Sequence, residues 1–448
     1  MGSSVSNLLS SNNTGTGLGQ GIDVSQFVTL ALAGDQANIT QLQKQQTALS
    51  SQTTALAQIT TDLNNLQQAS FALSDPLGAL NGLTTTSSNA GVVTATAASS
   101  AQAGTHNVTV SALATTSSYY SNSLPASSVL AAGSFSVQIG TAPAATITID
   151  STNNTLAGLA EAINTKGIGI QASVISDANG SRLALVSATT GLPGDLTVSS
   201  NTTGLTFTKA VTGSNASLVV DGVPISSTSN TVSGAINGVT LNLASALPGT
   251  SVAITTAPDT TQATAAVNSF VSAYNTAIKD INAQFSVLSD GSGGGPLEAD
   301  GSLREAQAAL LAAVSYSTAG NNGAVNLESI GVSLNNDGTL TANAATLTSA
   351  LASNFSGVQA FLQATTTGFA NNLSKVLTNV TDSSTGTLGL DATGISQSSQ
   401  ALSQQISDLQ AALAVKQAAL TQTYAQVNVT LQELPLLQQQ LSQQLASA

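Results

Sequence analysis

The sequence offers few side chains that could carry out chemistry. Cysteine is absent, and a single histidine, His106, stands among eight basic and 21 acidic residues in a chain of 448. A histidine that serves as a general base or a metal ligand needs a nucleophile, a carboxylate or further ligands beside it. His106 instead lies in a polar–apolar alternation typical of a strand, with Val108 and Val110 on one face. We therefore interpret it as a structural residue.

Motif searches lead to the same interpretation. No G-x-S-x-G, H-E-x-x-H or P-loop sequence occurs. A chain without cysteine can form neither a disulfide framework nor a thiolate metal site, and a hydrolase would need a nucleophile–base pair that the sequence does not offer. The sequence predicts no catalytic residues, no cofactor and no metal ligands, so we expect a protein that is not an enzyme.

Glycine- and aspartate-rich segments resemble ligand-binding loops only superficially. The alternating glycines within residues 15–21 follow no strand and miss the G-x-G-x-x-G spacing, so we interpret them as a flexible hinge. Asp177–Gly180 and Asn336–Gly338 lack the downstream glutamate of an EF-hand calcium loop. Both are good turn sequences, and we expect turns there.

The charge balance narrows the choice of partners. Only 6% of residues are charged, and the net charge is −13 without a lysine or arginine cluster, which argues against binding nucleic acid or an anionic membrane surface. No apolar run approaches the ~18 residues of a membrane helix, so we expect no membrane insertion. The N-terminus has no basic segment followed by an apolar one, which predicts export without a cleaved signal peptide. Contacts with partners must then depend on shape, apolar patches and neutral hydrogen bonds.

The two ends of the chain carry heptad patterns. Asp23 is placed as the N-cap of a first helix, with Gln26 three residues later, and Asp75-Pro76 ends that helix because proline cannot continue it. The C-terminal row is regular, whereas its companion row is broken by Lys416, Thr423 and Thr430. Pro435 is expected to kink or end the last helix. The predicted assembly or coiled-coil seam comprises Leu42, Leu49, Leu56, Leu63, Ile406, Leu409, Leu413, Leu420, Val427, Leu434 and Leu441. An intermolecular seam and a simple intramolecular bundle helix explain this pattern equally well.

Between the ends, the period changes to that of strands. Residues 84–256 alternate polar and apolar positions, with turn signals every ~8–12 residues and hairpin signals at Asp221-Gly222 and Asn237-Gly238. A short helix is expected near Leu156–Ile163, and helical spacing returns at residues 263–278 and 302–314. The fold class is therefore α+β: a helical coiled-coil or bundle stem formed by both termini, with two β-rich head domains inserted in the middle.

Domain boundaries follow from these changes of pattern. We expect a flexible N-terminal leg segment at 1–38, a helical stem domain at 39–83 plus 258–401, a β domain forming an inner head at 84–116 plus 213–257, a β-rich outer head with an internal repeat at 117–212, and a C-terminal coiled-coil leg at 402–448.

Longer stretches of sequence go beyond composition and period. Residues 21–67, GIDVSQFVTLALAGDQANITQLQKQQTALSSQTTALAQITTDLNNLQ, and 92–114, VVTATAASSAQAGTHNVTVSALA, resemble the N-terminal region of the flagellar hook-associated protein 2 family, the filament caps. Residues 155–191, TLAGLAEAINTKGIGIQASVISDANGSRLALVSATTG, resemble the internal repeat that flagellins and caps share. Residues 215–243, NASLVVDGVPISSTSNTVSGAINGVTLNL, and 330–347, IGVSLNNDGTLTANAATL, are similar to the C-terminal region of the cap family.

The resemblance implies a function and a set of partners. Caps of this family form a homo-oligomeric ring at the distal filament tip, where they promote folding and insertion of flagellin and prevent its loss. The implied partners are flagellin, the hook–filament junction protein and an export chaperone on the C-terminal helix; the implied location is outside the cell, on the bacterial flagellum. The alternative that the residues leave open is a flagellin-like filament subunit or a surface adhesin.

Overall fold

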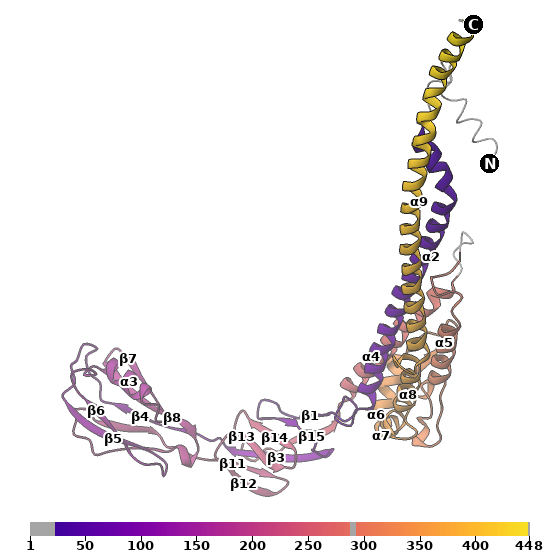
Figure 1. Cartoon of the computed structure of the whole chain (residues 1–448). Coiled ribbons are helices and arrows are strands. Elements are labelled where there is room, and N and C mark those ends of the chain that lie inside the picture. Colours follow the sequence, from indigo (N-terminus) through magenta and orange to yellow (C-terminus); the bar gives the residue numbers. More distant parts are fainter. Residues whose placement is uncertain (1–22, 287–292, 447–448) are drawn as a thin grey trace.

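The computed structural model describes residues 23–286 and 293–446, and the chain is long and bent (Figure 1). Two paired helices rise from a helical body, which we call the stem, and two β domains follow one another away from the other end of the stem. The chain passes out through the nearer β domain, the inner head, forms the outer head, and returns through the inner head to the stem. Three separate hydrophobic cores correspond to the stem and the two heads.

The first described helix, α2, runs without interruption from Val24 to Ser74. Asp23 caps it, because its carboxylate accepts the backbone N–H groups of Ser25 and Gln26, as the capping pattern predicts. The helix ends at Asp75, before Pro76. Residues 24–38, for which the sequence suggests a flexible segment, are therefore helical, whereas residues 1–22 and the glycine-rich hinge lie outside the described range.

The stem packs the second half of α2 against helices from the C-terminal half of the chain. Its core is apolar and includes Phe369, whose ring centroid lies 5.4 Å from that of Phe270 and 5.8 Å from that of Phe361. A small hairpin covers one side. The elements are α4 Thr260–Phe285, α5 Gly301–Val314, α6 Ala344–Ser353, α7 Phe355–Gln363, α8 Phe369–Thr381, β16 Val332–Leu334, β17 Leu340–Ala342 and the short 3₁₀ turns Asn321–Gly323 and Glu328–Ile330.

The inner head is a sandwich of two antiparallel sheets. A five-stranded sheet, in the order β1-β15-β3-β11-β12, faces a three-stranded sheet, β13-β14-β2. Both predicted hairpins are present, at Asp221-Gly222 and at Asn237-Gly238. The strands are β1 Leu83–Ser87, β2 Val93–Ala97, β3 Gly104–Ala112, β11 Ala216–Val220, β12 Val223–Ser227, β13 Thr231–Ile236, β14 Val239–Leu243 and β15 Val252–Pro258.

The outer head combines a four-stranded sheet, β10-β4-β8-β7, with a three-stranded sheet, β6-β5-β9, and the short helix α3. Phe135 is fully buried between them and contacts Phe207 at 4.9 Å between ring centroids. The elements are β4 Thr116–Ser121, β5 Gly133–Ile139, β6 Ala145–Ile149, α3 Leu156–Thr165, β7 Ile170–Asp177, β8 Gly180–Thr190, a 3₁₀ turn at Leu192–Gly194, β9 Leu196–Ser199 and β10 Phe207–Val211.

The last helix, α9, runs from Thr387 to Ala446, which excludes one of the two effects expected of Pro435. Pro435 lies inside it and does not end it. Proline fits helical backbone angles; its cost is a lost hydrogen bond to the carbonyl four residues earlier and a clash there. Because most residues around Pro435 are exposed, water can reach the freed carbonyl of Leu431, and the helix continues.

Candidate functional site: the helical leg

The chain's two terminal helices lie side by side and antiparallel, beyond the stem (Figure 1). We call residues 24–51 of α2 and 401–446 of α9 the leg. Val28, Leu32 and Ile39 are buried on α2, and Ile406 is buried on α9. The α2 residues are spaced by four and seven positions, which brings them onto one helix face. The leg is therefore held by one narrow apolar seam, with polar side chains on its other faces.

The predicted seam residues fall into three groups. Leu56 and Leu63 are buried in the stem core and contribute nothing to the leg seam. Six residues are buried or half-buried within the leg: Leu42, Leu49, Ile406, Leu409, Leu413 and, nearer the tip, Leu420. Val427, Leu434 and Leu441 are 42%, 40% and 59% exposed. The predicted seam residues of α2 and α9 thus lie in three different environments.

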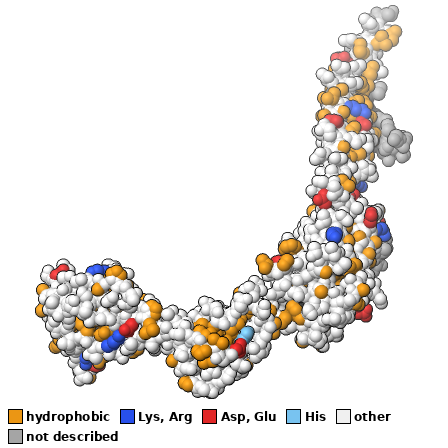
Figure 2. Space-filling model, turned by 90° about the horizontal axis from the view of Figure 1, so that it is seen from below, with side chains coloured by type: hydrophobic (Ala, Val, Ile, Leu, Met, Phe, Trp, Pro, Cys, Tyr) orange, Lys and Arg blue, Asp and Glu red, His pale blue; other side chains and the backbone are white. Residues whose placement is uncertain are grey.

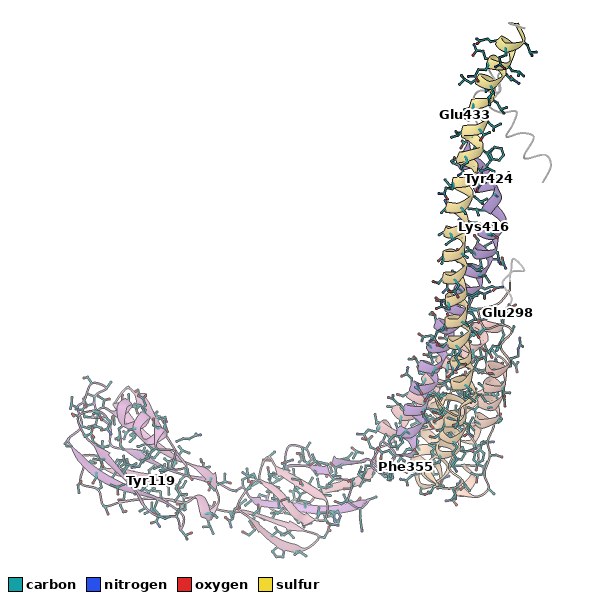
Figure 3. All side chains as sticks on the ribbon, viewed as in Figure 1. Tyr119, Glu298, Phe355, Lys416, Tyr424 and Glu433 are labelled. Atoms are coloured by element: carbon teal, nitrogen blue, oxygen red, sulfur yellow. The ribbon has the colours of Figure 1, made fainter. Side chains whose placement is uncertain are left out.

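A charged pair interrupts the apolar seam. Lys416 follows Leu409 and Leu413 at helical spacing, and its ammonium group lies 2.6 Å from the carboxylate of Asp35 on α2 (Figure 3). Asn38, Ile39, Leu409 and Leu413 line the same small hollow. The sequence marked Lys416 only as a break in its row. Its ion-pair partner, Asp35, could not be predicted from the sequence because it lies 381 positions away.

An aromatic contact marks the end of the paired region. The rings of Phe27 and Tyr424 lie 5.9 Å apart, close to the start of α2 at Val24. Beyond Tyr424, α9 continues through residues 425–446, about 33 Å of helix. No other described helix lies beside that part (Figure 3). It exposes Val427, Val429, Leu434, Leu436, Leu437, Leu441 and Leu445.

The distal part of α9 has the pattern of a docking surface. Val427, Leu434, Leu441 and Leu445 are spaced by seven, seven and four residues, so they fall on one face of the helix. A space-filling view shows apolar side chains gathered toward the tip of the leg, with few charged ones (Figure 2). Contiguous exposed apolar surface of this kind marks sites of interaction.

The single histidine of the chain belongs to a pair of charged groups in the inner head. His106 Nδ1 lies 2.6 Å from Asp221, whose other oxygen accepts the backbone N–H of Asn107. That N–H and the histidine lower the pKa of Asp221. The pair ties β3 to the β11–β12 turn, which agrees with a structural role for His106. Within the described residues, no group of three or more His, Cys, Asp or Glu could hold a metal ion.

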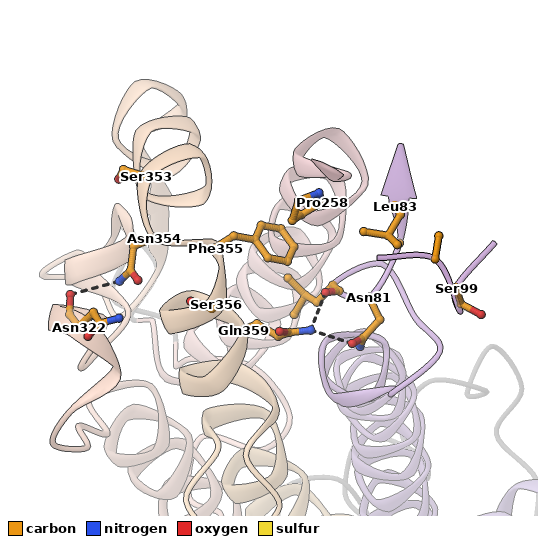
Figure 4. A pocket seen from close by; sticks show the side chains of 13 residues that line it. Asn81, Leu83, Ser99, Pro258, Asn322, Ser353, Asn354, Phe355, Ser356 and Gln359 are labelled. Atoms are coloured by element: carbon orange, nitrogen blue, oxygen red, sulfur yellow. Dashed lines mark hydrogen bonds between the residues drawn. The ribbon is translucent and has the colours of Figure 1, made fainter. Parts of the chain in front are cut away.

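A cleft lies where the stem meets the inner head (Figure 4). It has a volume of about 570 Å³ and is lined by both domains, with Phe355 and Gln359 on the stem side and Ser99 and Ala101 on the head side. Gln359 Nε2 donates to the carbonyl oxygen of Leu80 at 2.9 Å and to Asn81 Oδ1 at 2.7 Å. The cleft therefore borders the connection between the two domains, which the side-chain amide of α7 holds in place.

Comparison with known proteins decides the family. The model described as flagellar hook-associated protein 2 N-terminus matches residues 20–117, and the one described as its C-terminus matches residues 213–435. The B-type flagellar hook-associated protein 2 of Pseudomonas aeruginosa is 31% identical over 426 residues, which cover 86% of this chain and 89% of that protein. This chain belongs to the flagellar hook-associated protein 2 family.

Other family members agree in length and shape. Flagellar hook-associated protein 2 of Escherichia coli K12 is 28% identical, with 96% of this chain and 97% of that protein covered. The crystal structure of the flagellar cap protein FliD D1-D2-D3 domains from Escherichia coli is 28% identical. It has a TM-score of 0.57 and covers 76% of this chain and 99% of that one. No described helix is both long and apolar enough to cross a membrane.

Proposed function

We propose that this protein caps the growing end of a bacterial flagellar filament as a ring of identical subunits. The observation that carries the proposal is the match to both family models in chain order, with a flagellar cap protein of similar structure. In this proposal the heads form a plate over the filament end. The legs reach down to the newest flagellin subunits, which fold and insert beneath the plate and are kept from being lost.

The leg supports this proposal because one part of α9 is paired with α2 and the other part is not. The part paired with α2 is fixed by the seam and by the Asp35–Lys416 contact. The distal part of α9 exposes an apolar stripe, and helices with such a stripe bind in a hydrophobic groove or pair with another helix. We propose that this stripe binds an export chaperone before secretion and flagellin or the hook–filament junction protein afterwards.

A test should separate ring formation from leg docking. Light scattering and electron microscopy of the purified chain should give discrete small rings, whereas open-ended polymers would favour a filament subunit and a monomer would favour an adhesin. In a strain that lacks its own cap, the chain should restore motility and reduce the flagellin released into the medium.

Leg docking can be tested with matched variants. Leu434→Asp with Leu441→Asp places two charges on the stripe, and Gln432→Asp with Gln439→Asp adds the same charge elsewhere on α9. We expect the first pair to abolish motility and retain rings, and the second pair to have little effect. Equal loss with both pairs would refute the role of the stripe.

A further inference from the structure

Strands at sheet edges expose unpaired backbone groups, and most edges of the two heads are closed. In β12, Pro224 lacks the N–H group that would face outward. Bulges interrupt β10 and β13, and β9 has only four residues. Hydroxyl groups of β1 donate to carbonyl oxygens of β2, which joins those two edges. Two carbonyl oxygens of β6 accept hydrogen bonds from Lys166 and Asn153.

Strand β7 of the outer head differs from these edges. It pairs with β8 in unbroken register from Ile170 to Asp177, and no strand of the described residues pairs with its other side. At Ala172, the side-chain amide of Asn164 on α3 occupies both outward backbone groups, at 2.7 and 2.8 Å. Because the groups alternate along an antiparallel ladder, Val174 and Ser176 face the same open edge. Helix α3 lies next to β7, and its contact through Asn164 is with the first part of this edge.

The rest of the edge carries none of the usual protection. All five residues of Ser173–Asp177 are exposed, with Val174 at 37% and Ile175 at 59%. The stretch contains no proline, no lysine and no bulge, and its one charge, Asp177, is at its end. An exposed edge without these features, with Val174 and Ile175 at its centre, is a template for pairing with another strand.

We propose that Ser173–Asp177 of β7 pairs with the same stretch of a second copy, antiparallel about a two-fold axis at Ile175. In this register Val174 exchanges both backbone hydrogen bonds with Ser176 of the partner subunit, and the reciprocal pair does the same. Ile175 then faces the partner subunit's Ile175 in a non-hydrogen-bonded pair, where side chains are closest. The segment is its own complement.

Charge favours a second copy in this register. Asp177 falls opposite Ser173 of the partner subunit, and the two Asp177 carboxylates are separated by four residue steps, about 13 Å along the strands. That is more than the Debye length of about 8 Å at physiological ionic strength, so their repulsion is largely screened. A register that placed the two carboxylates opposite each other would be destabilised.

The contact has a consequence for assembly. A two-fold contact uses the same surface on both subunits and cannot be repeated around a larger ring. The β7 edge would therefore join chains in pairs, or one ring to another, without closing the ring itself. The inference stands whether or not the protein caps filaments.

The absence of cysteine allows a direct test of the register. With the full chain, Ile175→Cys should form a disulfide-linked dimer under mild oxidation, because Cα atoms of a non-hydrogen-bonded pair lie about 4.5 Å apart, within disulfide range. Ser173→Cys alone should not crosslink. A mixture of the Ser173→Cys and Asp177→Cys chains should yield the mixed dimer.

A second measurement needs no crosslink. Ile175→Lys should remove the paired species from light scattering while rings, if formed, persist; Val129→Lys, at another exposed position of the outer head, should leave the pairs intact. The proposal is overturned if Ile175→Cys forms no disulfide-linked dimer or if Ser173→Cys crosslinks as efficiently as Ile175→Cys. It is also overturned if the paired species survives in Ile175→Lys. Binding of a different polypeptide at this edge would give the first of these results.

Discussion

At the scale of single residues, Asp391 carries the clearest pH dependence. It lies near the start of α9, facing Asp300, the N-cap residue of α5. One of its carboxylate oxygens is buried without a hydrogen-bond partner. Burial, and then the Asp300 carboxylate, raise the pKa of Asp391 to about 6. In water an aspartate titrates near 3.9, so the folded chain binds more protons than the unfolded chain between about pH 4 and 6.

It follows that stability falls as pH rises through that window. Asp391→Asn should remove this slope, because the amide is never charged. Since Asp391 is only partly buried, solvent weakens the effect, and we expect the variant to melt roughly 2–4 °C higher than wild type at pH 7 and equally at pH 4. Thermal unfolding followed at 222 nm measures the difference, with Asp408→Asn as an exposed control on α9. Parallel wild-type and variant curves would contradict the assignment.

Asp35 and Lys416 make a second prediction at this scale. Both side chains are about half exposed, so their ion pair should contribute only ~0.2–1 kcal/mol. Its effect should be on register instead, as with single polar residues in coiled-coil seams. Lys416→Asp places two carboxylates together, and Asp35→Lys combined with Lys416→Asp restores the pair.

The measurement is hydrogen exchange of backbone amides in residues 28–42. We expect faster exchange in Lys416→Asp and recovery in the double variant. Exchange as fast in the double variant as in the single one would mean that the pair does not set the register.

At the scale of elements, the periodicity of the sequence predicted which helices and strands form better than it predicted what each of them packs against. Both terminal helices, the two hairpins and the helix at α3 were predictable, because period, caps and turn residues are local. One heptad row ran from Leu42 to Leu63, yet Leu63 packs in the stem core and Leu42 in the leg. Spacing gives the face of a helix and not what covers it. For the same reason Asp35, far from Lys416 in sequence, could not be found.

Pro435 supplies the prediction for α9 as an element. Interior proline costs about 3 kcal/mol relative to alanine, so the distal part of the leg should be less stable than its apolar content suggests. Pro435→Ala should increase protection of residues 431–441 from hydrogen exchange by more than tenfold. Glu433→Ala, two positions away on the same exposed helix, should change it little. Equal protection in Pro435→Ala and wild type would show that the helix tolerates this proline without loss.

At the scale of the whole molecule, two short connections govern how the heads are carried. The stem and the inner head are joined at residues 75–82 and again at Asp259. Asp259 donates its backbone N–H to the carbonyl of Gly82, which binds the two connections together. Asn81 Nδ2 also donates to Gln363 Oε1 at 3.0 Å, next to the bonds from Gln359. Side-chain amides from one helix, α7, therefore hold the joint.

Removing one amide should loosen the joint without unfolding either domain, since each has its own core. In the cysteine-free chain, spin labels at Ala101→Cys and Ser356→Cys report the width of the cleft, which both residues line. Gln359→Ala should broaden the distance distribution between them, because Leu80 and Asn81 lose their donor. Ser353 lines the same cleft, and its hydroxyl donates to the carbonyl of Ser349 within α6, so Ser353→Ala serves as the control. An unchanged distribution in Gln359→Ala would locate the rigidity in the backbone connections rather than in the amides, and the angle of the heads would then be fixed by the chain path alone.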